Sequence, residues 1–236
     1  MGIQKTLVIT GASKGIGYAT ATLFHNNGYR IVNISRSPIT LEGAVQINAD
    51  LSDINWLSGV SDTLLNSVAG SDEIVVIHCA ANHKHDTIAS LEAHTLQQVL
   101  QANLVAPVQL SQCLLPHMKA GSSVIFLGST LSEKAVANAC SYVTSKHAVI
   151  GLMRSTCQDL IGKNIHTACV CPGFTDTEML RVHVGDSQEI LKDIASRVSF
   201  NRLIQPEEIA DTLYFCATNP AINGSVIHAN LGQIES

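Results

Sequence analysis

Short apolar runs, rich in β-branched residues, alternate along the chain with longer segments whose apolar residues recur every three or four positions. Such short runs are typical of buried strands, and the longer spacing is typical of amphipathic helices. We predict strands at 6–10, 30–35, 44–48, 73–79, 123–129, 165–171 and 225–230. We predict helices at 15–27, 53–68, 92–118, 141–161 and 206–218. This order indicates an α/β fold: a doubly wound (Rossmann) parallel sheet with helices on both faces.

No linker, internal repeat or low-complexity tract divides the chain, so we expect residues 1–236 to form a single domain. Only 14% of the residues are charged, whereas an average domain has roughly a quarter. Apolar residues also lie on more than one face of the predicted helix at 92–118, which Pro107 should kink. We therefore expect a homo-oligomer, a dimer or a tetramer, with this helix at a subunit contact.

The formal net charge of -5 and the pI near 6.0 indicate no basic surface for nucleic acid or for an anionic membrane. We find no signal peptide and no apolar run long enough to cross a bilayer. The seven cysteines form no CxxC pair, and we expect them to be buried thiols of a reducing compartment. Small-molecule chemistry in the cytoplasm is the resulting expectation.

A glycine-rich turn, TGASKGIG at residues 10–17, joins the first predicted strand to the first predicted helix. Sheets of this type bind ligands beyond the carboxyl ends of their strands. Without side chains, the turn lets a pyrophosphate approach backbone N–H groups and the positive end of the helix. Such a turn can also serve chain geometry alone. Its position favours nucleotide binding by Gly11, Ser13, Lys14, Gly15, Ile16 and Gly17.

The end of the second strand bears on the choice of cofactor. An NAD enzyme usually has an acid there to hold the ribose hydroxyls, but this chain has Ser35 and Arg36, and no acid before Glu42. A guanidinium beside an uncharged hydroxyl suits the 2′-phosphate of NADP, and Lys14 could add a second positive charge. We expect NADP(H), with NAD as the weaker expectation. The alternative is that Arg36 is an ordinary solvent-facing residue.

Three further strand ends supply candidate cofactor contacts. After the third strand, Asp50 could bond the adenine amino group or only shape a turn, and Leu51 could pack on the ring. The fourth strand ends in residues that allow a ribose to approach, although the last could only bridge backbone groups: Ala80, Ala81 and Asn82. The sixth strand leads into a turn with hydroxyl groups: Pro172, Gly173, Phe174, Thr175 and Thr177.

Tyr142 and Lys146 are four residues apart in a predicted helix, so their side chains share one face. Ser129 ends the fifth predicted strand, and all three residues should lie at the same sheet edge as the glycine turn. The plainer interpretation is an amphipathic helix with an exposed lysine. A carbonyl that accepts hydride needs a proton, which a free phenol gives reluctantly at neutral pH. The Lys146 ammonium would stabilise the Tyr142 phenolate, and Ser129 would stabilise developing alkoxide charge.

With these residues the chain resembles the short-chain dehydrogenase/reductase family in its classical form, over essentially its whole length. The resemblance rests on TGASKGIG, CAAN, Asn103, Ser129, YVTSK and PGFTDT, and continues through NRLIQPEEIA to GSVIHANLG. It implies an NAD(P)-dependent oxidoreductase acting on CH–OH groups, with a catalytic tetrad of Asn103, Ser129, Tyr142 and Lys146. It also implies that Asn103 fixes a water linking Lys146 to solvent, and that Tyr142 and Lys146 lie against the cofactor.

Two positions depart from the family pattern. CAAN at 79–82 replaces the frequent NNAG, so that Asn82 stands where a glycine is common, and ANLG replaces VDGG near the end of the chain. The first change could crowd the cofactor edge slightly, and neither touches the tetrad. HKH at 83–85 lacks the partners of a metal site, so we expect no metal and expect its imidazoles to line the mouth of the substrate cleft.

The segment 176–205 resembles the family's substrate lid. Its residues suggest a mainly apolar pocket: Met179, Leu180, Val182, His183 and Val184. Arg181 and Arg197 keep an acidic or carrier-bound substrate open. The sequence predicts an NADPH-dependent reductase that interconverts a small-molecule ketone and a secondary alcohol. The alternatives are reduction of a 3-oxoacyl thioester and, in a different class, a non-catalytic NADP-binding sensor or scaffold.

Overall fold

Seven parallel strands form one sheet in a computed structural model that describes residues 3–185 and 187–233. The strands are β1 Lys5–Thr10, β2 Arg30–Ser35, β3 Val45–Asn48, β4 Glu73–His78, β5 Ser123–Leu127, β6 His166–Pro172 and β7 Ser225–Ala229. Every predicted strand is present, with its ends within two residues of the prediction. The order β3-β2-β1-β4-β5-β6-β7 confirms the doubly wound α/β sheet.

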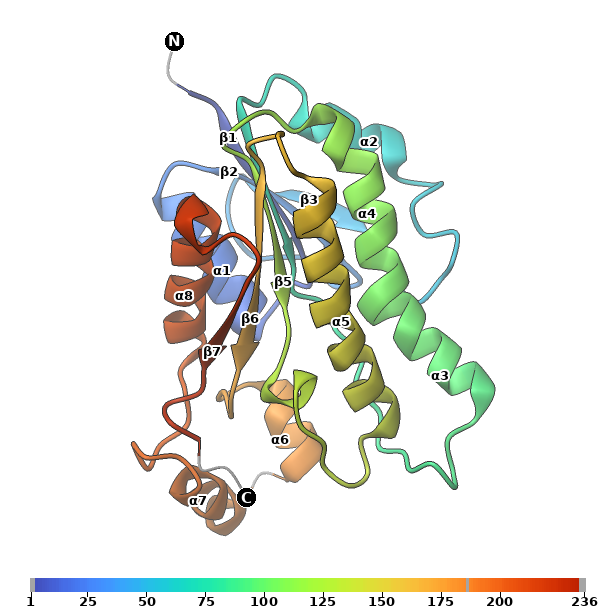
Figure 1. The fold of residues 1–236 in the computed structure, drawn as a ribbon, viewed down its shortest axis with the longest axis vertical. Helices are drawn as coiled ribbons and strands as arrows, with labels where there is room; N and C mark the ends of the chain where they lie inside the picture. Colours follow the sequence, from blue (N-terminus) through green and yellow to red (C-terminus); the bar gives the residue numbers. More distant parts are fainter. Residues whose placement is uncertain (1–2, 186, 234–236) are drawn as a thin grey trace.

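Helices cover both faces of this sheet (Figure 1). One face carries α1 Gly15–Asn26 and α8 Pro206–Thr218, and the other carries α2 Ser61–Val68, α4 Ala106–Leu114 and α5 Cys140–Asp159. α3 Ala93–Leu100 extends the line of α4, while α6 Glu178–Val184 and α7 Gln188–Ser196 lie past the carboxyl ends of β5 and β6 (Figure 1). Short helical turns lie at Gln101–Val105 (η1), Leu115–His117 (η2), Thr130–Ser132 (η3) and Pro220–Ile222 (η4).

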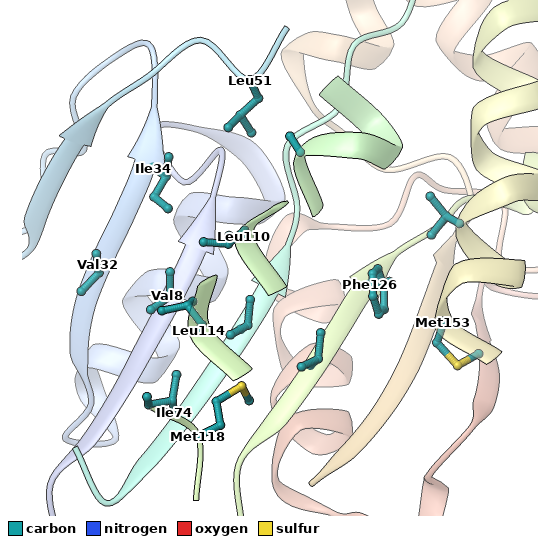
Figure 2. Packing of buried hydrophobic residues seen from close by; sticks show 14 of the residues in the cluster. Val8, Val32, Ile34, Leu51, Ile74, Leu110, Leu114, Met118, Phe126 and Met153 are labelled. Carbon is teal, nitrogen blue, oxygen red and sulfur yellow. The ribbon is translucent and has the colours of Figure 1, made fainter. Parts of the chain in front are cut away.

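Two apolar layers explain why the central strands are apolar at nearly every position. Val8 of β1 faces the layer beneath α4, whereas its neighbours Leu7 and Ile9 face the layer beneath α1 and α8. Figure 2 shows Leu110 and Leu114 of α4 against the strand residues of the first layer. Because both faces are covered, polar side chains of the strands can act only where the strands end.

The helix predicted at 53–68 is wrong in its first half, because α2 begins only at Ser61. Before it, the side chain of Asp50 accepts a hydrogen bond from the N–H of Ser52 at 3.0 Å, and Asp53 accepts one from the N–H of Asn55 at 2.9 Å. Such local bonds offer the backbone an alternative to helical hydrogen bonds. The segment therefore forms turns and places Asp50 directly after β3.

The helix predicted at 92–118 is interrupted near Pro107, as expected, but by a π-helical turn at Gln101–Val105. Pro107 has no N–H group, so it cannot donate the usual helical bond to the carbonyl oxygen of Asn103, four residues earlier. Asn103 lies within the π turn, with 3% of its surface exposed. Single π turns inside helices often accompany functional sites, and this turn brings Asn103 toward the ends of the strands.

Candidate active site

The glycine turn after β1 leaves no room for a side chain where it passes β4. Gly11 has a φ of 74°, and a Cβ atom there would approach the Cα of Ala80 to 2.9 Å. The hydroxyl oxygen of Thr10 accepts hydrogen bonds from the N–H groups of Cys79 at 3.1 Å and Ala80 at 3.0 Å. The turn and the end of β4 therefore form one close-packed floor, open to backbone contact by a ligand.

The side chain of Asn33 in β2 holds the same turn from the other side. Its Oδ1 accepts the N–H of Ala12 at 2.9 Å, and its Nδ2 donates to the hydroxyl of Ser35 at 2.7 Å. The glycine turn leads directly into α1, whose N-terminus offers unpaired N–H groups to an anion. The residues predicted to bind a pyrophosphate, Gly11, Ser13, Gly15, Ile16 and Gly17, lie in this turn and in the first turn of α1.

Of the two predicted 2′-phosphate ligands, Lys14 already has an acidic partner, whereas Arg36 is exposed. Lys14 donates to Glu178 of α6 at 2.7 Å, and both side chains are 65% exposed. Arg36 is exposed beyond the end of β2, while Ser35 is buried and donates to the carbonyl oxygen of Ser37 at 2.6 Å. Exposed ion pairs contribute little stability, so Lys14 can exchange partners at small cost.

Asp50 and Leu51 occupy the end of β3. Both the hydroxyl and the N–H of Ser52 donate to Oδ1 of Asp50, and these bonds, with smaller help from nearby Arg36, lower the pKa of Asp50. Asp50 is thus a turn residue, one of the two interpretations that the sequence allowed, and it is exposed. Leu51 is 8% exposed and belongs to the apolar layer under α4, so it packs against protein more than the sequence suggested.

The end of β4 is fixed by the amide side chain of Asn103. Its Oδ1 accepts the N–H of Asn82 at 2.6 Å, and its Nδ2 donates to the carbonyl oxygen of Asn82 at 2.9 Å and to the hydroxyl of Ser145 at 2.9 Å. Ser145 in turn donates to the carbonyl oxygen of Tyr142 at 2.8 Å. Asn103 therefore ties the β4 end, with Ala80, Ala81 and Asn82, to the first turns of α5.

Tyr142 and Lys146 lie on the same face of α5, as their spacing predicts. They are 9% and 3% exposed, which excludes the interpretation that Lys146 is a solvent-facing residue. The Nζ of Lys146 is 5.5 Å from the centre of the Tyr142 ring and donates to the carbonyl oxygen of Leu127 at 2.7 Å. This single bond to the end of β5 orients a buried ammonium group toward the phenol.

Ser129 follows β5 and begins the short turn η3. Its hydroxyl oxygen accepts the N–H of Leu131 at 3.1 Å, and its own N–H donates to Oγ of Ser132 at 3.1 Å. Gly128 precedes it, where a Cβ atom would lie 2.7 Å from the sulfur of Cys171 and 2.9 Å from that of Cys169. The hydroxyl of Ser129, which is half-buried, still has its proton available for a substrate oxygen.

Asp86 caps the N-terminus of α5 from a distant loop. Its carboxylate, in a residue 6% exposed, accepts the N–H of Ser141 at 2.9 Å and a short hydrogen bond from the Ser141 hydroxyl. Backbone bonds between Asp86 and the residues before α5 add to this contact. Since Tyr142 follows Ser141 directly, Asp86 helps to set where the phenol lies.

The turn after β6 crosses the glycine floor. Thr175 donates to the carbonyl oxygen of Gly173 at 3.1 Å, and the hydroxyl of Thr177 caps α6 by accepting the N–H of Leu180 at 3.3 Å. A Cβ atom at Gly15 would meet the Cγ2 of Thr177 at 3.4 Å, so this turn lies over the start of α1. The predicted contacts Pro172, Gly173, Phe174, Thr175 and Thr177 thus line the same edge.

The HKH segment contacts the candidate catalytic tyrosine, which the sequence did not indicate. The ring of His83 stacks on the ring of Tyr142, with centres 4.1 Å apart and planes 19° apart. His183 of α6 contacts His83 edge-on, and His85 lies beside His183. The part of the chain that the structure describes has no group of three or more His, Cys, Asp or Glu side chains arranged to hold a metal ion.

Four residues outside the predicted set, Thr10, Asn33, His83 and Asp86, thus hold the predicted ones in place. Thr10 and Asn33 belong to predicted strands, His83 belongs to the HKH segment, and Asp86 lies in the loop that follows it. Only the distant partner of each side chain shows its role. The cysteines are only partly as expected: all seven are free, with Cys169, Cys171 and Cys216 buried and the other four half-buried. Within residues 3–185 and 187–233, no helix combines the length and apolarity needed to cross a membrane.

Fold and site together define a dinucleotide-binding oxidoreductase of the Rossmann type, and comparison with known proteins makes the class specific. A family model described as enoyl-(acyl carrier protein) reductase matches residues 11–233. Dehydrogenase/reductase SDR family member 6 of Xenopus laevis is 30% identical, over 91% of this chain and 90% of its own. The chain belongs to the short-chain dehydrogenase/reductase family, whose members are NAD(P)-dependent oxidoreductases.

Solved structures agree with this assignment over nearly the whole chain. A short-chain dehydrogenase family protein from Francisella tularensis subsp. tularensis SCHU S4 is 27% identical, covers 98% of both chains and has a TM-score of 0.86. A short-chain dehydrogenase from Burkholderia cenocepacia J2315, solved in complex with NADP, is 24% identical, with a TM-score of 0.84 and 98% of each chain covered. The second likeness shows the fold.

Proposed function

We propose that the protein is an NADPH-dependent carbonyl reductase, which interconverts a small-molecule ketone and a secondary alcohol. The observation that carries the proposal is the burial of Tyr142 and Lys146 on one face of α5, beside the end of β5 where Ser129 lies. Burial of an ammonium group beside a phenol costs free energy unless the charge is hydrogen-bonded, paired or needed for function. A proton donor, its activating charge and a hydroxyl donor therefore meet at the ligand-binding edge of the sheet.

The bound nicotinamide would supply and accept the hydride. Tyr142 would give its proton to the substrate oxygen and take it back in the reverse direction. A unit charge about 5 Å away, at an effective dielectric of about 20, stabilises the phenolate by roughly 3 kcal/mol, which is the contribution we assign to Lys146. Ser129 would donate its hydroxyl proton to the same substrate oxygen, and Asn103 would keep α5 aligned with β4 through Asn82 and Ser145.

The preference for NADPH over NADH is part of the proposal and rests on the end of β2. Ser35 stands where an acid would repel a 2′-phosphate, and Arg36 is exposed and close to the rim. Lys14 would contribute after exchanging its bond with Glu178 for the phosphate. A guanidinium matches phosphate oxygens with two parallel donors, which an ammonium cannot do.

Reduction of a 3-oxoacyl thioester is the second candidate. The description of the matching family model as an enoyl-(acyl carrier protein) reductase supports it only in naming a carrier-bound acyl substrate, because an enoyl reductase reduces a C=C bond. An acidic carrier would need free cations near the mouth of the site. Arg181 binds Asp176 at 2.7 Å, and Arg197 binds Asp193 at 2.6 Å. Arg202 binds Glu208 at 2.6 Å. All three arginines of the segment 176–205 are thus already paired, which favours a small neutral carbonyl compound.

A screen of turnover tests the proposal against all its alternatives. Purified protein is offered NADPH or NADH with ketones, secondary alcohols and 3-oxoacyl thioesters, and the absorbance of the reduced cofactor is followed. We expect turnover of ketones with NADPH. Faster turnover of the thioesters would favour the second candidate. Tight NADPH binding without turnover of any compound would favour the non-catalytic sensor or scaffold.

We further propose a cytoplasmic homo-oligomer, a dimer or a tetramer, built as a single domain with residues 176–205 as its substrate lid. The proposal of self-association is supported by the small number of charged residues and by exposed apolar side chains on helices, such as Phe215 of α8, 50% exposed. Light scattering at micromolar concentration measures the assembly directly. A monomer at that concentration would contradict this proposal.

A further inference from the structure

Four rings form a continuous contact from the candidate catalytic helix to the candidate lid. The first is Tyr142 of α5, on which His83 stacks. The ring centre of His83 is 3.4 Å from that of His183, with the planes at 81°. His85 completes the set, 5.0 Å from His183, and its Nε2 is 3.2 Å from the His183 carbonyl oxygen. We call His83, His85 and His183 the imidazole cluster.

The cluster is built for uncharged imidazoles. Both ring nitrogens of His183 are buried and have no hydrogen-bond partner within the described residues, so a second proton on this ring would add a buried N–H group without an acceptor. The rings of His183 and His83 also meet edge to face, with their planes 81° apart, a geometry that aromatic pairs prefer. A positive charge on either ring would lie in van der Waals contact with the other imidazole in a half-buried site. Burial disfavours such a charge.

We propose that His83 is a positioning residue for the reaction: its uncharged ring holds the plane of the Tyr142 phenol and couples it to α6, so that seating of the lid and orientation of the proton donor depend on each other. The kinetic part rests on the proposed reductase function, and the structural part does not. The coupling between His83 and α6 depends neither on the glycine floor nor on the choice between NADPH and NADH.

The charges around His83 give this coupling a pH dependence with a definite sign. Burial lowers the pKa of His83 to about 4, and the imidazoles of His183 and His85 and the Lys146 ammonium lower it too, against the opposing effect of Asp86. Burial and the nearby His85 also lower the pKa of His183. If α6 moved away from His83, the pKa of both rings would lie near the ordinary imidazole value of 6.5. As the pH falls, this displaced form takes up protons first. The form in which α6 contacts His83 therefore loses stability relative to it between about pH 6.5 and about pH 4.

Three variants test the proposal. His83→Phe keeps a stacking ring that cannot be protonated, His83→Ala removes the ring, and His25→Phe, at the exposed end of α1, is the matched control. Two measurements are made between pH 5 and 8. One is kcat and KM with NADPH and the best ketone of the screen, and the other is the hydrogen-exchange protection of the α6 amides in the protein without substrate.

For the wild type we expect kcat and α6 protection to fall together below about pH 6. His83→Ala should lower kcat about 2- to 10-fold at pH 7.5, the equivalent of one aromatic pair, and should reduce α6 protection at every pH. His83→Phe should retain kcat within about threefold at pH 7.5 and move the acidic fall of both quantities to lower pH. His25→Phe should match the wild type in both.

Two results would overturn the inference: a His83→Ala protein with unchanged α6 protection, or a His83→Phe protein whose α6 protection falls at the same pH as in the wild type. Both are read without turnover. If the screen found no substrate while α6 protection followed the expected pattern, the reductase function would fail and the ring coupling would stand.

Discussion

Two parts of the same sheet edge differ in how firmly their polar groups are held. Where β5 ends and α5 begins, Tyr142 and Lys146 are buried, and Lys146 is bound to a backbone carbonyl group. Where β2 ends, Arg36 is exposed, and Lys14 shares a solvent-accessible ion pair with Glu178. The first region has one arrangement available to it, whereas the second can exchange partners.

This difference predicts where substitutions will matter most. In the buried region each group acts at short range in a low dielectric, so the loss of one atom removes an interaction that water cannot replace. At the exposed rim, solvent and salt screen each charge, and a lost contact is partly replaced by water. We therefore expect the larger changes at the first region, reaching about a hundredfold or more where the proton donor is removed, and changes of about tenfold at the second.

The strongest test removes only the hydroxyl of Tyr142. Tyr142→Phe should lower kcat at least about 100-fold, because the substrate oxygen loses its proton donor, while the NADPH dissociation constant changes little. Steady-state kinetics and a fluorescence titration with NADPH measure the two quantities. Tyr214→Phe, in α8 and away from the sheet edge, is the control. Full activity of Tyr142→Phe would remove Tyr142 from the mechanism.

Lys146→Met tests whether one buried charge serves both chemistry and cofactor. We expect kcat to fall at least about tenfold, NADPH binding to weaken and the pH profile to move upward, since the phenolate loses its stabilising ammonium. Kinetics over a range of pH, together with NADPH titration, provide the comparison. Lys163→Met, an exposed position after α5, should change none of these. A loss of turnover with unchanged NADPH binding would exclude a contact between Lys146 and the cofactor.

Asp86→Asn tests whether the distant cap holds the start of α5. The variant keeps the volume and one acceptor oxygen but loses the negative charge at the positive end of the helix. We expect a loss of about 1–3 kcal/mol in the free energy of unfolding, the range of a charge-assisted bond at a helix end. Denaturant unfolding measures it, with the exposed Asp211→Asn in α8 as control. Equal stability of both variants would show that the cap contributes nothing.

The exposed rim gives the smallest predicted effect. The wild type should prefer NADPH over NADH by at least about tenfold in kcat/KM, because a well-made charge-assisted contact is worth roughly 1.5–3 kcal/mol. Arg36→Ala should remove most of this margin, and Ser35→Asp should reverse it. Arg154→Ala, exposed on α5, should leave the ratio unchanged. Equal efficiency of the wild type with both cofactors would mean that Arg36 serves only the surface.

Residues recognisable from local pattern were predicted well. The shared face of Tyr142 and Lys146 follows from helical geometry, and the glycine turn joins β1 to α1 as its sequence predicts. The first half of the helix at 53–68 was mispredicted. Asp50 and Asp53 accept hydrogen bonds from N–H groups two residues further on, and these local bonds outweighed the apolar periodicity. Such competition between local alternatives is decided by small energies that periodicity does not report.

The alternation of strands and helices, the glycine turn after β1 and the shared face of Tyr142 and Lys146 could be predicted from the amino-acid sequence, because each depends on residues near one another in the chain. The folded structure was needed to show that Asp86 caps α5, that Lys14 pairs with Glu178 and that His83 lies between Tyr142 and His183. The contact of Asp86 with Ser141 joins residues 55 positions apart in the chain, and that of Lys14 with Glu178 joins residues 164 positions apart. His83 is likewise distant in the chain from Tyr142 and His183. Their geometry is set by how the packed helices and strand ends meet, which no local pattern encodes.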